Sequence, residues 1–308
     1  MVRGLRSVCF ALGFVTLALA GTVVLAVALV GCSSAASSES AELGSAENPV
    51  QLGVVGASDP YWAVYEAAVE AEGIQLEIVD FTEYTQPNPA LSEGELDVNQ
   101  FQHVQYLGDY NVSSGEDLQP IGATAIYPLG LYSVKYESVD DIPDGETVVV
   151  PNDTVNQARG LLVLQSAGLI ALAEGGSPAS TLEDVLPESR VEVEAVDAAL
   201  TVNSLPDVAA AIVNNDFLGP AGLSSQDALV ADDPSDEAAL PYVNIFAARA
   251  DDADNEVLLQ LVEIFQSNQE VLDGLQEVAG GTAVFATTPA ADLQASLVEV
   301  EESLQAQG

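Results

Sequence analysis

Short apolar runs alternate with amphipathic stretches along the chain from residue 50 onward. Runs of four to eight apolar or alternating residues predict strands. Those strands are expected at 50–55, 74–81, 96–98, 120–126, 130–136, 146–150, 191–196 and 242–249. Helices are expected at 61–72, 88–95, 103–110, 154–167, 206–213, 255–267 and 289–304, where apolar residues recur at helical spacing. Strands that alternate with helices in this way predict an α/β protein built on parallel sheets.

The first 31 residues follow a different pattern. Arg3 and Arg6 precede an almost unbroken apolar run from Val8 to Val30, as in an export signal. The run ends in Leu-Val-Gly-Cys at 29–32, which resembles the lipobox of bacterial lipoproteins, so Cys32 is the expected site of lipidation. An uncleaved membrane anchor is the alternative, because the run exceeds about 18 apolar residues. Small polar residues then predict a flexible tether over 32–47.

The charge of the chain limits the partners that it can bind. There are 48 Asp and Glu against 6 Lys and Arg, a net charge of −42. Removal of both cations of the signal would leave −44, and binding to nucleic acid, which needs clustered cations, is excluded. We interpret the acidity as an adaptation of the surface to salt, with a cationic ligand as the alternative.

Little catalytic chemistry is available. The only cysteines are Cys9 and Cys32, and His103 is the only histidine, so neither a Cys-based nor a His-rich metal site is expected in the folded body. The chain has no G-x-S-x-G elbow and no glycine-rich phosphate loop. We therefore expect neither an enzyme nor a cofactor.

Two local groups of residues have the character of a binding site. In the first, PNDTVNQAR at 151–159 runs from a strand into a helix start, a natural seat for an anion. The fork of Arg159 suits a carboxylate, and Asn156 lies one turn earlier on the same face. We expect Arg159 to lie near the helix start and outside the core, and pairing with a surface acid is the alternative to ligand binding.

The second group joins YTQPN at 84–88 to FQHVQY at 101–106. Tyr84, Phe101, His103 and Tyr106 would gather near two strand-to-helix junctions, where open α/β sheets bind ligands. Aromatic walls suit a polarizable side chain such as a thioether. A place in the core is an equally good interpretation of these aromatic residues.

The motifs around these residues resemble the NlpA/MetQ family, lipoproteins that bind methionine for ABC importers. FTEYTQPNPALSEGELDVNQFQHVQYL (81–107) is similar to a long family motif, as are PNDTVNQAR and DVAAAIVNNDFLGPAGL (207–223). The resemblance covers about 50–267. Gln100, Phe217-Leu218 and Gln157-Ala158 depart from the family's usual residues at those positions.

The resemblance implies a periplasmic-binding-protein-like fold, with two α/β lobes, a ligand cleft between them and two crossover segments. The lobes are expected at 48–128 plus 243–308 and at 129–242. By position, Tyr84, Phe101, His103 and Tyr106 would surround a thioether. Asn156 and Arg159 would hold the α-carboxylate, and Asn214 the amino-acid head group.

The expected partners follow from the same resemblance. They are methionine, an ABC permease, and the outer face of the cell membrane, to which the lipid on Cys32 would attach the protein. The ligand could be L-methionine, D-methionine, a methionine dipeptide or another neutral amino acid. A surface lipoprotein or adhesin of the same fold, without a transport partner, is the alternative function.

Overall fold

The computed structural model of the protein describes residues 41–235 and 237–307. The predicted signal segment, Cys32 and the first part of the predicted tether lie outside those residues. The last part of the predicted tether is described and lies against the body, because the Gly44 carbonyl accepts a hydrogen bond from the Gln75 N–H at 2.7 Å and Leu43 packs on the core. Within the described residues, no helix combines the length and the apolar character needed to cross a bilayer.

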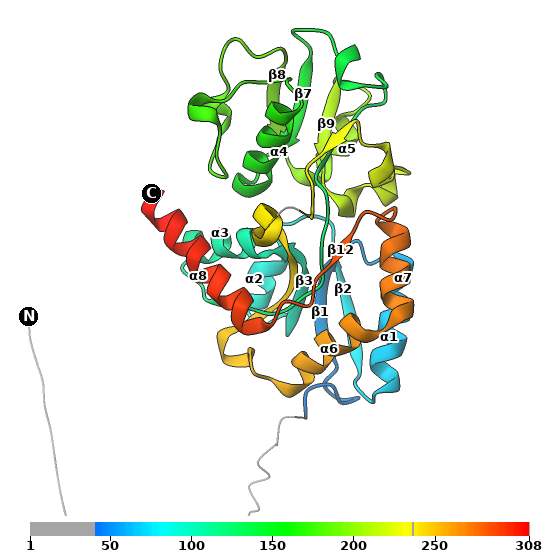
Figure 1. Ribbon diagram of the computed structural model, residues 1–308. Helices are drawn as coiled ribbons and strands as arrows, with labels where there is room; N and C mark the ends of the chain where they lie inside the picture. The colour runs from blue at the N-terminus through cyan, green and yellow to red at the C-terminus, as the bar shows by residue number, and fades with distance from the viewer. Residues whose placement is uncertain (1–40, 236, 308) are drawn as a thin grey trace, which may run out of the picture. The chain divides into compact units, whose positions relative to one another are not determined.

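One mixed sheet is formed by strands from the first part of the described chain together with β11 from its last part, in the order β2-β1-β3-β11-β4 (Figure 1). Its strands are β1 (Val50–Val55), β2 (Leu76–Phe81), β3 (Val98–His103), β4 (Leu118–Ala123) and β11 (Asn244–Arg249). Strands β1, β2 and β3 are parallel, whereas β11 runs antiparallel to both β3 and β4. Most residues of β1 and β3 are buried, as expected of a sheet that helices cover on both faces.

A second mixed sheet contains the middle of the chain, in the order β10-β6-β9-β7-β8. Its strands are β6 (Gly130–Tyr132), β7 (Thr147–Pro151), β8 (Glu192–Val196), β9 (Ala210–Val213) and β10 (Val230–Ala231). The chain passes from the first sheet to the second through 127–129 and returns through 232–243. A short pair, β5 (Ala125–Ile126) with β12 (Val284–Phe285), lies beside the first of these segments. The fold is thus α/β with two sheets, one in each lobe, and the exact lobe boundaries at 128/129 and 242/243 stay a prediction.

Helices cover both sheets. Around the first sheet lie α1 (Pro60–Ala71), α2 (Pro87–Ser92), α3 (Val104–Ser114), α6 (Glu256–Ser267), α7 (Gln269–Val278) and α8 (Ala290–Gln307). Helices α4 (Thr154–Ser166) and α5 (Ala198–Ser204) pack on the second sheet. The 3₁₀ turns are η1 (Val139–Asp141), η2 (Ala173–Gly175), η3 (Leu182–Asp184), η4 (Asn215–Phe217), η5 (Gly219–Ala221), η6 (Ser225–Asp227), η7 (Glu237–Tyr242) and η8 (Ala250–Asp252).

The core divides in the same way as the sheets. One cluster lies between the first sheet and α1, α6 and α7, where Trp62, Tyr65 and Phe265 stack edge to face. A second cluster lies on the side of α3 and α8, and a third fills the second lobe. A fourth cluster contains Tyr84 and Phe101 from the first lobe together with Phe217 from the second. Apolar contact therefore joins the two lobes in the described conformation.

Several predicted elements are wrong in type or position. Both sheets are mixed and not parallel, because β11 and β6 run against their neighbours. Residues 206–213 were expected to be a helix, but 210–213 form β9, a fully buried strand at the centre of the second sheet. A short apolar run fits a buried helix or a buried strand equally well, and only the pairing with β6 and β7 decides. Helices α5 and α7 were not predicted.

Two boundaries near the candidate site also differ. Helix α2 begins at Pro87, one residue before the predicted Asn88 cap, because proline at the first helical position already has a helical φ. His103 was expected inside a helix, but it ends β3 and caps α3. The helix expected at 61–72 is α1, which ends at Ala71; Gly73, just after it, has a φ of 90°, which favours glycine.

Candidate ligand-binding site

All seven residues selected from the sequence line one pocket. Tyr84 follows β2, Phe101 and His103 end β3, and Tyr106 lies in the first turn of α3. From the second lobe come residues of α4 and of the turn after β9; they are Asn156, Arg159 and Asn214. Strand ends of both sheets meet here, as expected for ligand sites of open α/β sheets.

The aromatic part of the pocket is a cluster of tilted and edge-on rings. The ring centroids of Tyr84, Phe101 and Tyr106 lie 5.8–6.1 Å from one another. Phe217 of the second lobe approaches Tyr84 to 5.1 Å, so both lobes contribute to this wall. The Tyr106 hydroxyl donates to the Tyr84 carbonyl at 3.2 Å, which fixes the two rings relative to each other. Such a surface can hold an apolar, polarizable side chain.

His103 is a neutral group in the pocket wall. Its Nδ1 accepts a hydrogen bond from the Tyr106 N–H at 3.1 Å, as the cap of α3. Burial and the nearby Arg159 guanidinium together lower the pKa of His103 to about 3, against an opposing effect of the Asn156 side chain. With Nδ1 accepting, the ring proton lies on Nε2. His103 can therefore donate one hydrogen bond at neutral pH.

Arg159 lies deeper than its place in the sequence indicated, since its side chain is only 7% exposed. Its Nε and Nη2 atoms donate to the Asp232 carboxylate at 2.6 and 3.1 Å, and Nη2 also donates to the Tyr127 carbonyl at 2.8 Å. The Tyr242 ring lies against the guanidinium, 4.4 Å from Cζ to the ring centroid. Among the described residues, Nη1 has no hydrogen-bond partner. That edge of the guanidinium is left for a ligand.

Two buried amides complete the polar end of the pocket. Asn156 and Asn214 are 2% and 7% exposed, and the Asn214 Nδ2 donates to the Asn156 Oδ1 at 3.1 Å. The Asn214 Oδ1 is buried and has no hydrogen-bond partner within the described part of the chain. A buried acceptor without a partner costs about 1–3 kcal/mol. A ligand that donates a hydrogen bond would remove this cost.

Several residues of the site were not selected from the sequence. Gln102, Tyr127, Asn215 and Asn244 also line the pocket, and Asp232 holds Arg159 from outside it. Asp232 is one of 48 acidic residues, so nothing local distinguishes it. Gln102 belongs to the FQH motif and could have been predicted as a site residue. Its side chain, however, forms hydrogen bonds in a buried network with the amides of Asn88 and Asn99.

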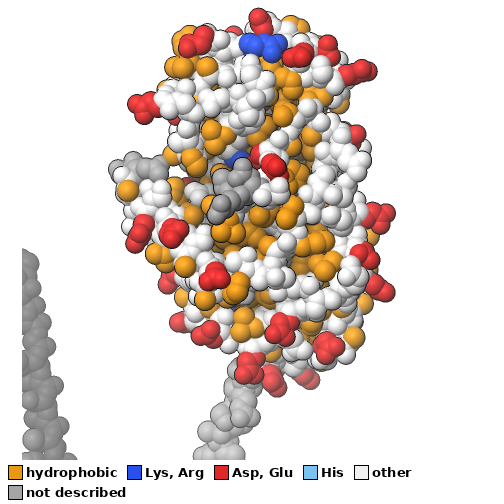
Figure 2. Space-filling model, viewed as in Figure 1, with side chains coloured by type: hydrophobic (Ala, Val, Ile, Leu, Met, Phe, Trp, Pro, Cys, Tyr) orange, Lys and Arg blue, Asp and Glu red, His pale blue; other side chains and the backbone are white. Residues whose placement is uncertain are grey.

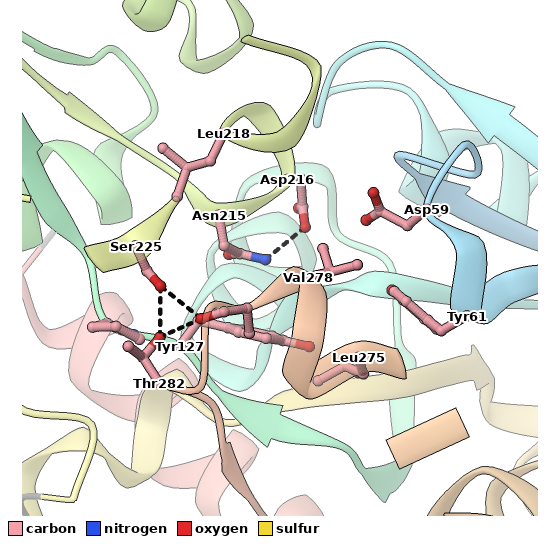
Figure 3. A pocket seen from close by; sticks show the side chains of 12 residues that line it. Asp59, Tyr61, Tyr127, Asn215, Asp216, Leu218, Ser225, Leu275, Val278 and Thr282 are labelled. Carbon is pink, nitrogen blue, oxygen red and sulfur yellow. Dashed lines mark hydrogen bonds between the residues drawn. The ribbon is translucent and has the colours of Figure 1, made fainter. Parts of the chain in front are cut away.

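A second pocket lies next to the first and shares Tyr127 and Asn215 with it. Figure 3 shows Asp59 beside α1 and Asp216 in η4 on the same side of this pocket. The Asp216 Oδ2 accepts a hydrogen bond from the Tyr84 hydroxyl at 2.8 Å, a bond between the lobes. At the other side, the Ser225 hydroxyl donates to the carbonyl of Ala279, just after α7, at 2.6 Å.

The two carboxyl groups of this second pocket are easier to protonate than usual. Burial raises the pKa of Asp216 to about 7; the Asp59 charge raises it too, while hydrogen bonds from Tyr84 and Asn215 lower it. Burial and the charge of Asp80 raise the pKa of Asp59 to about 6. Tyr61 and Tyr127 lie close enough to Asp216 for its charge to raise their pKa, and none of the residues that line the pocket is Lys or Arg.

The family model of the NlpA lipoproteins matches residues 50–286, three quarters of the chain. The chain belongs to the NlpA lipoprotein family. A similar protein, the probable D-methionine-binding lipoprotein MetQ of Pasteurella multocida (strain Pm70), is 34% identical over 265 residues, which cover 84% of this chain and 95% of that one. The assignment to this family, predicted from the 81–107 and 151–159 motifs, is confirmed.

Solved structures agree with the family assignment. An ABC transporter periplasmic substrate-binding protein from Coxiella burnetii superposes with a TM-score of 0.70 at 35% identity, covering 77% of this chain and all of that one. A nutrient-binding protein from Burkholderia cenocepacia, bound to methionine, superposes with a TM-score of 0.71 at 34% identity, covering 77% and 99%. The binding-protein fold predicted from the sequence is therefore confirmed.

Proposed function

We propose that this protein captures methionine outside the cytoplasm and delivers it to an ABC permease. The observation that carries the proposal is the single pocket that joins Arg159, Asn214 and the aromatic wall from two lobes. Similarity to proteins named for methionine binding and for ABC transport supports it. No catalytic role is proposed for any residue.

The groups of the pocket match the parts of an amino acid. Nη1 of Arg159 would hold the carboxylate, because a guanidinium donates to carboxylates in a fixed plane. The Asn214 Oδ1, which lacks a partner among the described residues, would accept from the α-ammonium. The rings of Tyr84, Phe101 and Tyr106 would contact the thioether, and sulfur–aromatic contacts contribute about 0.3–1.5 kcal/mol each.

Closure of the lobes would follow from the same arrangement. The carboxylate and ammonium partners lie in the second lobe and most of the rings in the first, so only a closed form contacts the whole ligand. A ligand shifts a conformational equilibrium by its difference in affinity for the two forms. The closed, loaded form would be the one that the permease recognises.

Attachment to the membrane is the second part of the proposal. A lipid on Cys32 would hold the body at the outer face of the membrane, with the segment after it as a tether. Mass spectrometry of the native protein should then find a chain that begins at Cys32 with added acyl mass, and Cys32→Ser should prevent this. An intact Met1 on the native protein would support the uncleaved anchor instead.

Isothermal titration calorimetry tests the ligand. We expect binding of L-methionine, D-methionine or a methionine dipeptide, and weaker binding of leucine and glutamine. Asn214→Ala should weaken methionine binding about 10- to 100-fold, the equivalent of a buried bond to a charged group. Asn203→Ala is the matched control, because Asn203 is exposed on α5. Absence of heat with every amino acid would refute the proposal and favour the adhesin function; tight binding of a different neutral amino acid would correct the ligand.

A further inference from the structure

The Asn214 Oδ1 has no hydrogen-bond partner among the described residues, so the orientation of the Asn214 side-chain amide decides what the pocket offers a ligand. An amide side chain has a donating end and an accepting end, and its neighbours decide which end the pocket receives. The Asn214 Nδ2 donates a hydrogen bond to the Asn156 Oδ1 at 3.1 Å. As long as the Asn156 oxygen points toward Asn214, the Asn214 NH₂ group is directed at it, and the Asn214 Oδ1 remains as the acceptor for a ligand.

The orientation of Asn156 is in turn set by Asp153. The Asp153 Oδ1 accepts from the Asn156 Nδ2 at 3.0 Å and from the Asn156 backbone N–H at 2.8 Å. An ionised carboxylate only accepts hydrogen bonds, so it binds the NH₂ end of Asn156 and turns the oxygen end toward Asn214.

Asp153 also adds a negative charge next to the two linked side-chain amides, those of Asn156 and Asn214. Its Oδ2 is shielded from solvent and has no partner in the part of the chain that the structure describes. Burial raises the pKa of Asp153 to about 6, opposed by its bonds from Asn156, so most of the carboxyl group is ionised at pH 7.5. The nearby guanidinium of Arg159 is already paired with Asp232. A cationic group on the ligand would be the missing counter-charge.

We infer that Asp153 is a positioning residue that, through Asn156 and Asn214, makes the pocket select ligands with a protonated amine beside the carboxylate. The inference rests on the proposed binding of an amino acid and adds how the ammonium group is recognised. It assigns Asp153 a role beyond the helix cap of α4, in which its side chain accepts from the Asn156 N–H.

Asp153→Asn separates the two roles. Asparagine caps a helix about as well as aspartate, so α4 should keep its start. The new amide oxygen can still accept from Asn156, but it carries no charge and is a weaker acceptor than a carboxylate, so the orientations of Asn156 and Asn214 are less strongly fixed. If the variant melts far below the wild type, Asp153→Ser takes its place, because serine also caps helices but can donate as well as accept.

The measurement is a ratio of affinities. Calorimetry at pH 7.5 compares methionine with 4-(methylthio)butanoate, which has the same carboxylate and thioether but no amine. The wild type should prefer methionine by about 100-fold, and Asp153→Asn should reduce this ratio by about tenfold, or 1.4 kcal/mol. The affinity for the amine-free compound should change less than about threefold, because that compound makes no use of the amide chain.

Asp109→Asn is the control for charge alone. Asp109 lies close enough to raise the pKa of Asp153 but takes no part in the hydrogen bonds of Asn156 and Asn214. In Asp109→Asn, the ratio of the affinities for methionine and 4-(methylthio)butanoate should stay at the wild-type value. An unchanged ratio in Asp153→Asn, or an equal loss in both variants, would overturn the inference. Failure of the wild type to bind methionine would refute the proposed function itself, which is a different result.

Discussion

Truncation of Asp232 tests how the polar end of the pocket is built. Asp232 lies in the return segment between the lobes, and its carboxylate accepts two hydrogen bonds from Arg159 and a third from the Leu129 N–H at 2.7 Å. Leu129 and Tyr127 belong to the outgoing segment, and Arg159 also binds the Tyr127 carbonyl. One ion pair therefore ties both crossover segments to α4.

The expected loss of folding stability follows from how deeply each partner of the Arg159–Asp232 ion pair is buried. Removal of one partner of a fully buried pair costs about 3–5 kcal/mol, because the other charge stays buried. The Arg159 side chain is 7% exposed, but that of Asp232 is 30% exposed, so water partly replaces the lost carboxylate. We therefore expect Asp232→Ala to lower the free energy of unfolding by about 3 kcal/mol, at the lower limit of that range. At about 2–4 °C per kcal/mol, the melting temperature should fall by about 6–12 °C.

Urea unfolding without ligand, followed by the fluorescence of Trp62, measures this loss. Trp62 is the only tryptophan and is 2% exposed, so its emission reports on the core. Asp144→Ala is the matched control: Asp144 accepts from the Arg190 Nε at 2.9 Å but is 80% exposed, and such pairs contribute less than about 1 kcal/mol. If both variants lose the same stability, the ion pair at Asp232 does not hold the crossover segments, and the reasoning fails.

Three further predictions concern pH, the contact between the lobes and salt. The raised pKa values of Asp59 and Asp216 mean that the folded form binds more protons than the unfolded chain between about pH 4 and 7. The melting temperature should therefore rise as pH falls from 8 to 5, and Asp216→Asn should reduce that rise; an identical slope in the variant would contradict the assignment. Tyr84→Phe removes the hydrogen bond to Asp216 and should weaken methionine binding about three- to tenfold in calorimetry, about 1 kcal/mol, while an unchanged affinity would show that this bond does not stabilise the closed form. Acidic side chains are scattered over the face shown in Figure 2, mostly toward its edge, and Lys and Arg are few there. The melting temperature should therefore climb from 10 mM to 1 M NaCl or KCl as salt screens the repulsion between acidic side chains, and a flat series would refute that explanation.

Local pattern was sufficient for the elements that have a clear period or cap. Strand β1 was predicted with its observed bounds, and α4 begins after Asp153, within one residue of the expected start. In these places the apolar spacing and the capping residue indicate the same structure. The strand β9 was predicted as a helix because four apolar residues show no periodicity of their own, and its partners in the neighbouring strands lie 62 to 83 residues away in sequence.

The seven candidate residues came from motifs, and the structure adds that they line a common pocket. The partners that orient them were not predictable. Asp232 is 73 residues from Arg159, and Asn214 is 58 residues from Asn156. With 48 acidic residues in the chain, no local signal distinguishes an aspartate that pairs with the buried arginine from one that faces water.

The sequence by itself determined the class of the protein: an α/β chain of one known family, with a large excess of acidic residues. These properties depend on composition, periodicity and contiguous motifs, which are local. Only the tertiary structure decided that Arg159 is buried and tied to both crossover segments, and that Asn214 has an acceptor free within the described residues. Burial and hydrogen-bond partners depend on which distant segments fold together, and for a charged or amide group they determine what it can bind.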